Sequence, residues 1–326
     1  MTDADTDTTD GDTLESDKPP DVAAASDTVA SIADNVEKVI VGKRETIEHI
    51  LTALLGRGHV LLEDVPGVGK TMLARAVACS FGGEFGRVQF TPDLLPSDVT
   101  GVNVYNQQTE TFEFRAGPVF GNIVLGDEIN RAPPKTQSAL LEAMEENQVT
   151  VDGERHPLPD PFLIIATRNT VEGDKSYDLP MAQLDRFTKA LRLGYPDPAE
   201  EAEILGRVVG THPIADLAPV ATLADVRAAR TAASAVTVAP DIREYTTRIA
   251  RYTREIAQLG VSPRGSIALL RAAQGRAVLD GRSYVVPMDV QTEAPSVLGH
   301  RIRTTGERTG LDLVAEALET VPVDES

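Results

Sequence analysis

The sequence predicts an α/β core, with a largely parallel β-sheet covered by helices on both faces, followed by an all-helical domain. Three apolar segments, 60–62, 123–125 and 162–165, have the length and composition of buried strands. Segments with helical periodicity separate them, and strands that alternate with helices form parallel sheets. After residue 196 apolar side chains recur every three or four positions, and no strand pattern follows. A chain of 326 residues is long enough for two such domains.

The helices follow from the spacing of apolar residues in chain order. Five segments are expected to be helices: 45–55, 72–78, 139–144, 242–256 and 267–277. In the first and in the last two of them, apolar residues have the three-to-four-residue period of an amphipathic helix. Gly56 and Gly58 end the first of them. The strand at 60–62 then runs through a Gly-rich segment into the second helix, and the third helix lies between the second and third strands.

Two further segments predict β-hairpins attached to this core. Residues 102–105 and 111–114 flank a polar turn. Residues 149–151 and 154–158 flank Asp152-Gly153, a dipeptide that readily adopts the positive φ angles of a tight hairpin turn.

Negative charge is concentrated at the amino terminus. The chain has 50 acidic and 31 basic side chains, a net charge of −19, and residues 1–30 hold nine acids, one Lys and no aromatic residue. We therefore expect a disordered acidic tail over residues 1–30. The α/β core then covers 31–196, and the helical domain covers 197–326.

The composition also indicates a cellular setting. Arg outnumbers Lys by 24 to 7, and an acidic, Lys-poor chain is typical of salt-accumulating cytoplasms, which predicts a halophilic archaeal source. A GC-rich genome that favours Arg codons is the alternative. The charge argues against nucleic acid as a partner. No apolar stretch approaches the ~18 residues of a membrane span, and the single Cys79 excludes an intramolecular disulfide, so we expect a soluble, cytoplasmic protein.

A phosphate-binding loop is predicted between the first strand and its helix. Residues 64–71 read Asp-Val-Pro-Gly-Val-Gly-Lys-Thr, the second half of the P-loop pattern, with Asp64 where the strict motif has Gly. Its glycines let backbone N–H groups surround phosphate oxygens, Lys70 reaches the β- and γ-phosphates, and Thr71 ligates Mg²⁺. The predicted nucleotide contacts here are Val65, Pro66, Gly67, Val68, Gly69, Lys70, Thr71 and Met72.

The second strand ends in two acids. Residues 123–126 are followed by Asp127 and Glu128 at the carboxyl end of the strand, where open α/β sheets bind ligands. Asp127 is placed to hold Mg²⁺, and Glu128 is placed to polarise the attacking water. A strand followed by a solvated turn would also carry acids, but it would not predict the P-loop before it. ATP and Mg²⁺ are therefore the expected cofactors.

Four segments give the chain a resemblance to a known family. Residues 127–144 begin Asp-Glu-Ile-Asn-Arg-Ala-Pro-Pro and resemble the signature of the MoxR group of AAA+ ATPases. Residues 89–98, 179–187 and 262–271 are similar to the same group. The resemblance extends over residues 31–305 and, with the two hairpins, favours the helix-2-insert clade. It implies an AAA+ core with a C-terminal helical lid.

The resemblance implies further site residues. Asn169 resembles sensor 1, which orients the attacking water, although Arg168 before it departs from the usual uncharged residue. Arg264 resembles sensor 2, which reports the γ-phosphate to the lid. Arg186 resembles the arginine finger, which acts on a neighbouring subunit's nucleotide and is worth ~10³–10⁵ in rate. Arg131 faces a neighbouring site or forms a surface ion pair, and we favour the ion pair.

The Val41-Gly42 dipeptide and the aromatic side chains of the hairpins can each be interpreted in two ways. Val41-Gly42 resembles the family's adenine contact, but a plain turn at a helix start explains it equally well. In the helix-2-insert clade the hairpins project at the ring opening, which would bring Tyr105 and Phe112 to a substrate. Packing at an edge strand explains these aromatic side chains equally well.

The expected function is Mg²⁺-dependent ATP hydrolysis by a ring, a hexamer, of this chain. The family resemblance implies chaperone-like remodelling or maturation of client proteins, including metal or cofactor insertion, with partners that carry a von Willebrand factor A domain. One alternative is an ATP-gated assembly scaffold with little turnover. A DNA-remodelling motor is another, against which the acidic charge and the 4% aromatic content count.

Overall fold

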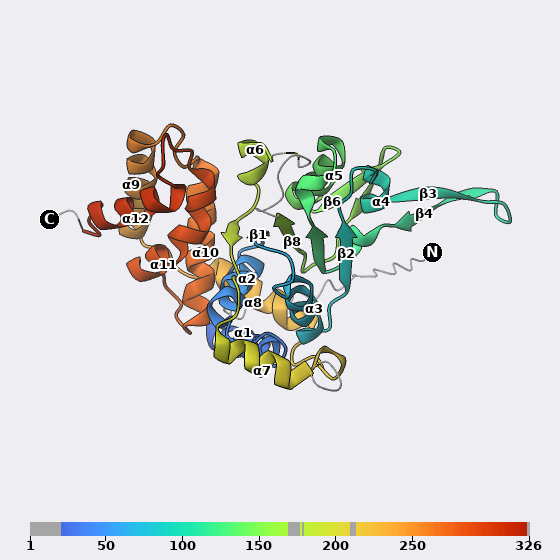
Figure 1. The fold of residues 1–326 in the computed structure, drawn as a ribbon, viewed down its shortest axis with the longest axis horizontal. Helices are drawn as coiled ribbons and strands as arrows, with labels where there is room; N and C mark the ends of the chain where they lie inside the picture. Colours follow the sequence, from blue (N-terminus) through green and yellow to red (C-terminus); the bar gives the residue numbers. More distant parts are fainter. Residues whose placement is uncertain (1–20, 169–176, 178, 209–212, 325–326) are drawn as a thin grey trace, which may run out of the picture.

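A computed structural model describes residues 21–168, 177, 179–208 and 213–324 of the chain. Its centre is a five-stranded, all-parallel sheet in the order β2-β5-β8-β1-β9 (Figure 1). These strands are β1 (Val60–Glu63), β2 (Phe85–Gln89), β5 (Ile123–Asp127), β8 (Leu163–Arg168) and β9 (Lys189–Leu191). The predicted parallel core is confirmed. The three strands predicted from the sequence form its centre, and β2 and β9 add the two edges.

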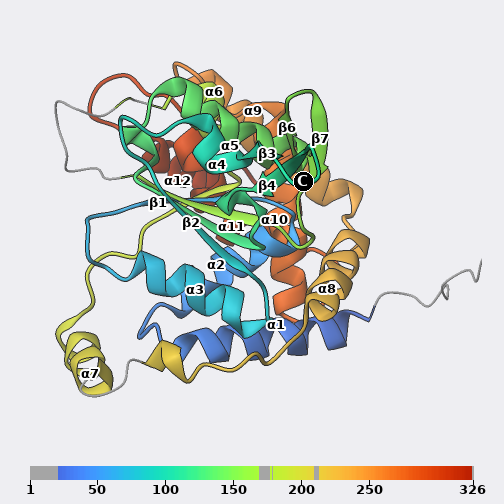
Figure 2. The ribbon, with the colours of Figure 1, turned by 90° about the vertical axis from the view of Figure 1, so that its right-hand side faces the viewer.

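Helices cover both faces of this sheet (Figure 2). On one face lie α1 (Val22–Glu37), α2 (Arg44–Leu55) and α3 (Lys70–Ser80), and on the other lie α4 (Pro96–Thr100) and α5 (Pro134–Glu146). Successive strand residues point to opposite faces. Val60 and Leu62 therefore join the core beneath α1 to α3, whereas Leu61 joins the core beneath α5. Both faces are buried, which explains why the central strands are continuously apolar.

Both predicted hairpins are present, on the face covered by α5. The first, β3 (Gly101–Asn106) and β4 (Thr111–Ala116), follows α4 and extends far from the body of the molecule (Figure 1). The second, β6 (Gln148–Val151) and β7 (Glu154–Pro157), follows α5 directly. Its turn residues Asp152 and Gly153 have φ angles of 51° and 87°, as the sequence predicts.

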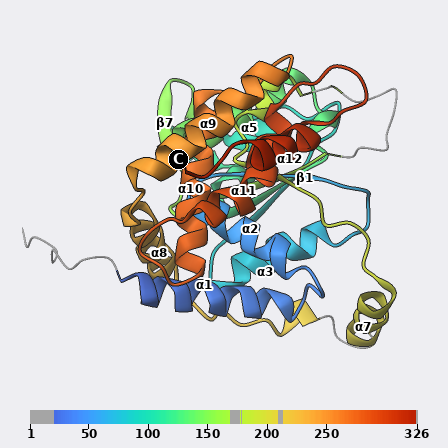
Figure 3. The same cartoon turned by 90° about the vertical axis from the view of Figure 1, so that its left-hand side faces the viewer.

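The carboxyl-terminal part is helical, as expected. Among the described residues after β9, pairing of extended backbone is limited to two isolated bridges, and no strand forms. The helices are α6 (Met181–Leu184), just before β9, and then α7 (Pro198–Val208), α8 (Leu223–Ala235), α9 (Pro240–Ile256), α10 (Pro263–Leu279), α11 (Pro287–Leu298) and α12 (Gly310–Thr320). Helix α8 packs along α1, and α10 packs against α2 (Figure 3). No helix in these described ranges has the length and apolar character needed to cross a membrane.

A buried ion pair joins the sheet to the helical part. Lys189 in β9 contacts Glu293 in α11, and both side chains are fully buried. Glu293 also accepts a hydrogen bond from Arg276 Nε at 2.9 Å and lies 3.3 Å from His49 Nδ1. Burial opposes the charge of Glu293, but Lys189 and His49 lower its pKa to about 2. Burial lowers the pKa of Lys189 to about 8, although Glu293 acts in the opposite direction.

The predicted acidic tail ends earlier than the sequence suggested. Residues 22–30, which we assigned to a disordered tail, form the first half of α1. Asp21 caps this helix by accepting the Ala24 N–H at 3.0 Å, and Ala25 and Val29 are buried in the core. Asp27, the one acid in this stretch, lies on the exposed side of the helix, and the charge of residues 1–21 concealed the apolar stripe that follows them. Residues 1–20 lie outside the described part of the chain.

Candidate nucleotide-binding site

The loop between β1 and α3 is shaped to hold phosphate. Gly67 and Gly69 have φ angles of 88° and 92°, a region that favours glycine. Gly69 caps α3, so the N–H groups of the first helical turn and the positive end of the helix dipole face the loop. The Lys70 amine donates a hydrogen bond to the Val65 carbonyl at 2.8 Å and therefore lies along the same loop.

Asp64 has a structural role that explains its departure from the motif. The residue is only 7% exposed. Its carboxylate accepts the N–H groups of Leu193 and Gly194, the latter at 3.3 Å, just after strand β9. A glycine at this position could not make these bonds. Asp64 therefore anchors the first residue of the loop to the neighbouring strand.

The carboxyl ends of β5 and β8 lie beside the loop, because the strand order places β8 between β5 and β1. Asp127 ends β5, and its carboxylate accepts hydrogen bonds from the Thr167 hydroxyl and from Arg87 Nη2, each at 2.8 Å. The Thr167 hydroxyl oxygen also accepts the Glu128 N–H at 2.8 Å. Thr167 thus fixes the positions of the two acids relative to each other.

Glu128 is held by two side chains. Its backbone has a φ of 58°, and one carboxylate oxygen accepts from Gln89 Nε2 at 3.0 Å and from Arg131 Nη1 at 2.8 Å. Arg131 does form an ion pair, and its partner is the predicted water-polarising acid. Gln89 lies at the end of β2, next to β5 in the sheet. These contacts hold the Glu128 carboxylate at the edge of the site.

Most of the predicted residues line one pocket of about 280 Å³. Its lining consists of Pro66, Gly67, Gly69, Lys70, Thr71, Met72, Arg87, Asp127, Glu128 and Thr167. Sequence reasoning missed Arg87, Gln89 and Thr167. The sequence pattern that could have indicated them was weak. Each is a polar residue near the carboxyl end of a strand, and the strand β2, which carries two of them, was not predicted.

Four predicted nucleotide contacts do not line this pocket: Val41, Gly42, Val65 and Val68. Asn169 lies outside the described residues. Arg168, the unusual residue before it, pairs with Glu63 at 2.7 Å, so its charge is compensated at the end of β1.

The donor set of this pocket fits Mg²⁺. The cation prefers oxygen ligands and binds through one or two protein groups, phosphate and water. Thr71 and Asp127 present a hydroxyl and a carboxylate to the same pocket, beside the loop that would hold the phosphates.

The structure favours a turn at Val41-Gly42. Gly42 has a φ of 70°, and a Cβ there would lie 1.7 Å from Glu200 Oε1. Lys43, the next residue, pairs with Glu200 at 3.3 Å. The positive φ therefore favours glycine at this position, whereas the flexible Glu200 side chain could turn away from a Cβ. An adenine contact at this turn stays a prediction.

Comparison with known proteins assigns the family. Residues 59–189 match the ATPase family associated with various cellular activities (AAA), and residues 249–320 match the AAA lid domain. The chain is 42% identical over 295 residues to Chaperone MoxR1 of Mycobacterium tuberculosis, covering 87% of this chain and 78% of that protein. It is 31% identical over 329 residues to Protein MoxR of Methylorubrum extorquens, covering 91% and 95%.

The chain belongs to the MoxR family of AAA ATPases. It is also 53% identical over 287 residues to the uncharacterized protein YeaC of Bacillus subtilis, covering 87% of this chain and 90% of that one. A crystal structure of a Cytophaga hutchinsonii protein assigned as an ATPase superposes with a TM-score of 0.88 at 35% identity, over 94% and 97% of the two chains. The predicted AAA+ core and helical lid are thereby confirmed.

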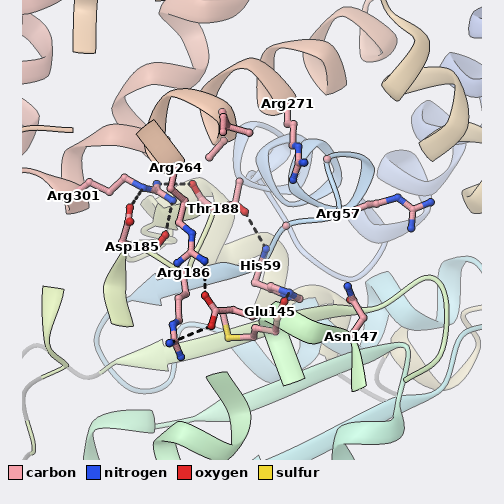
Figure 4. A pocket seen from close by; sticks show the side chains of 15 residues that line it. Arg57, His59, Glu145, Asn147, Asp185, Arg186, Thr188, Arg264, Arg271 and Arg301 are labelled. Carbon is pink, nitrogen blue, oxygen red and sulfur yellow. Dashed lines mark hydrogen bonds and ion pairs between the residues drawn. The ribbon is translucent and has the colours of Figure 1, made fainter. Parts of the chain in front are cut away.

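In this MoxR-family protein the two predicted arginines lie together, away from the P-loop. Arg186 precedes β9, whose first residue Lys189 pairs with Val60 at the start of β1. The P-loop follows the other end of β1, so the sheet separates it from Arg186. Arg264, at the start of α10, lines the same 480 Å³ pocket as Arg186 and not the P-loop pocket (Figure 4).

A shared carboxylate aligns the segments that carry these arginines. Asp185 accepts hydrogen bonds from Ser262 Oγ at 3.1 Å and from Arg301 Nε at 2.8 Å. Ser262 caps α10, two residues before Arg264, and Asp185 directly precedes Arg186. Burial lowers the pKa of Arg301, and Asp185 opposes that shift. Asp185 thus joins the two segments that present these arginines.

Proposed function

We propose that this protein hydrolyses ATP with Mg²⁺ at sites completed between neighbouring subunits of a ring, a hexamer. The separation of the two half-sites carries this proposal. The P-loop pocket lies at the carboxyl edge of the sheet, whereas Arg186 and Arg264 lie toward its amino edge. Neither arginine lines that pocket within one chain, so a second copy would supply them to a nucleotide bound there. A head-to-tail contact of this kind forms a ring when the rotation between successive subunits closes, as we propose here.

The chain's own groups would divide the work of phosphoryl transfer. The N–H groups of α3 and Lys70 bind and orient the phosphates, and Thr71 and Asp127 hold Mg²⁺. Mg²⁺ supplies neutralisation of phosphate charge when bound. Glu128 orients a water molecule for in-line attack and accepts its proton, giving ADP and phosphate. This requires the Glu128 carboxylate to turn from Gln89 and Arg131 toward the water.

Arg186 and Arg264 of the adjoining subunit would stabilise charge on the transferred phosphoryl group. An arginine supplied in this way contributes ~10³–10⁵ in rate. The family resemblance gave Arg264 the role of reporting the γ-phosphate to the lid. Its position beside Arg186 supports the same role, exercised on the neighbour's nucleotide.

We propose that this ATP hydrolysis drives the remodelling or maturation of client proteins. The relative MoxR1 is named a chaperone. On the projecting hairpin, Tyr105 and Phe112 are 50% and 71% exposed and pack against each other with ring centroids 5.3 Å apart. Exposed aromatic pairs are suited to binding apolar segments. We propose that this hairpin is the helix-2 insert and that client complexes include von Willebrand factor A domains.

Mixing two inactive variants tests the shared site. Lys70→Ala should abolish nucleotide binding but keep both arginines, whereas Arg186→Ala should bind ATP without turnover. In a 1:1 mixture roughly a quarter of the junctions combine an intact P-loop with an intact Arg186, so ATPase activity should return in part. Glu128→Gln should bind ATP, lose hydrolysis and restore nothing when mixed with Lys70→Ala.

The same experiment can refute the proposal. Full turnover by Arg186→Ala alone would show that each subunit contains a complete site. If particles that contain both variants showed no recovered activity, the arrangement in which one subunit supplies Arg186 to its neighbour would be refuted. The DNA-motor alternative is tested by adding single-stranded or duplex DNA to the wild type. That alternative requires the DNA to stimulate ATP turnover.

A further inference from the structure

One carboxylate holds both of the trans-acting arginines. Glu145 Oε2 lies 3.1 Å from Arg186 Nη2, and Glu145 Oε1 accepts a hydrogen bond from Arg264 Nη2 (Figure 4). The three side chains are 27%, 30% and 50% exposed, respectively. The charge of each arginine is therefore paired with a carboxylate of its own subunit. A phosphate from a neighbour has to replace that carboxylate before the arginines can act on it.

The resting position of Arg186 leaves donor capacity unused. Its Nε atom is buried and has no hydrogen-bond partner within the described chain. A guanidinium carries five N–H donors in a planar fork, and a phosphate group presents more acceptor oxygens to that fork than one carboxylate does. The ion pair with Glu145 is therefore a partial substitute for an arginine–phosphate contact.

Glu145 occupies a helix end that depends on these arginines. It lies in the last turn of α5, next to Glu146, and that turn contains no basic residue. Acidic side chains at the negative end of a helix dipole are unfavourable. Arg186 and Arg264 supply the missing positive charge from other segments. When they move to another partner, the last turn of α5 loses its compensation.

The same helix end supports the hairpins. Asn147 caps α5 with a φ of 49°, and its carbonyl accepts the Leu158 N–H at 2.9 Å, which closes the base of the β6–β7 hairpin. His156 of β7 stacks on Phe114 of β4, with ring centroids 3.8 Å apart and an interplanar angle of 11°. Contacts thus run from Glu145 through β6–β7 to the projecting β3–β4 hairpin.

We propose that Glu145 competes with the γ-phosphate of the neighbouring subunit's ATP for Arg186 and Arg264. Its release frees the end of α5 and thereby the hairpins. Glu145 is a positioning residue: it acts through the arginines and does not contact the reacting atoms. The proposal rests on the shared active site proposed above.

The test removes the competing charge. Glu145→Gln should lower the ATP concentration that gives half-maximal turnover by roughly three- to tenfold, since two partly exposed ion pairs are lost, with kcat unchanged within about twofold. Glu146→Gln is the matched control, because it removes the same charge from the same turn and no contact of Glu146 with an arginine is found in the described chain. It should leave the half-maximal concentration unchanged. Glu145→Asp should behave more like the wild type.

A second readout does not require turnover. In a Glu128→Gln background, sedimentation at fixed protein concentration measures the ATP needed for assembly. The double variant Glu128→Gln/Glu145→Gln should assemble at an ATP concentration lower by a similar factor than Glu128→Gln alone. Adding 1 M KCl should reduce the difference between these two proteins, because salt screens the ion pairs.

A lower kcat with unchanged ATP dependence would overturn the proposal, because Glu145 would then be needed in the active arrangement. Equal effects of Glu145→Gln and Glu146→Gln on assembly would overturn it as well. The mixture of Lys70→Ala and Arg186→Ala decides the shared site independently, since it leaves Glu145 intact.

Discussion

Substitution of Glu293 by Gln should destabilise this protein strongly and in a pH-dependent way. Glu293 and Lys189 are fully buried and join α11 to β9. Glu293→Gln keeps the shape and an oxygen acceptor for Arg276, but it leaves the Lys189 ammonium without a counter-charge in the interior. Breaking one partner of a buried ion pair costs about 3–5 kcal/mol.

The pKa of Lys189 limits its own share of that cost. An uncompensated Lys189 can release its proton, and keeping it neutral at pH 7, against an ordinary pKa of 10.5, costs about 4.8 kcal/mol. In the wild type the pKa is already lowered to about 8, which accounts for about 3.4 kcal/mol of the same penalty, so Lys189 adds about 1.4 kcal/mol to the loss at pH 7. The rest of the loss comes from the contacts of Glu293 with Arg276 and His49. Whole domains are stable by about 5–15 kcal/mol, so the variant should still fold near neutral pH.

The pH dependence has a definite sign. In folded Glu293→Gln, Lys189 is neutral, whereas in the unfolded chain it is protonated, so unfolding binds a proton and stability rises with pH. In the wild type Lys189 stays protonated below its pKa of about 8. The stability gap should thus shrink by about 1.36 kcal/mol per pH unit between pH 6 and 8. Above about pH 8 the free energy of unfolding of both proteins rises in parallel, so the gap becomes constant.

Urea unfolding followed by circular dichroism at pH 6, 7 and 8 measures this gap. The control is Lys189→Met combined with Glu293→Gln, which removes the buried charge and should recover most of the lost stability. A loss below about 1 kcal/mol would show that the Lys189–Glu293 pair does not stabilise the fold. A stability gap independent of pH below 8, or an absence of rescue by Lys189→Met, would show that Lys189 does not carry the effect.

Three further predictions concern the nucleotide site. Gln89→Ala removes one of the partners that restrain Glu128, so the ATPase rate without client should rise severalfold at saturating ATP; a fall would mean that Gln89 supports the active orientation. Asp64→Ala leaves one buried and one partly buried N–H group after β9 unpaired and should cost about 1–3 kcal/mol in thermal unfolding, with a smaller effect on ATP affinity. Gly69→Ala should cost about 1–2 kcal/mol from its positive φ, and calorimetric titration should detect weaker ATP binding than in the equally strained but distant Gly153→Ala.

Features that depend on neighbouring residues were predicted well from the sequence. The P-loop, the acids at the end of β5 and the Asp152-Gly153 turn each need only a few consecutive residues with particular backbone and charge properties. The strands at the centre of the sheet were found because burial on both faces makes them continuously apolar.

Features that depend on partners distant in the sequence were missed or misassigned. Strands β2 and β9 lie at the sheet edges, and Gly86 and Arg87 interrupt the apolar pattern of β2. Residues 22–30 were assigned to a tail because the charge of residues 1–30 was counted as a whole, while the apolar stripe that buries Ala25 and Val29 was overlooked. The roles of Asp64 and Thr167 require knowledge of which strand ends adjoin.

The family, the α/β core and the chemical identity of the phosphate-binding groups could be predicted from the sequence, because they depend on short segments whose residues act together locally. The tertiary structure decided where Arg186 and Arg264 lie. They are 78 residues apart and meet because Asp185 accepts hydrogen bonds from both Ser262 and Arg301. Their distance from the P-loop follows from the direction of β1 and β9 in the sheet. Strand direction and side-chain pairing across the fold are properties of the packed chain, and no local pattern specifies them.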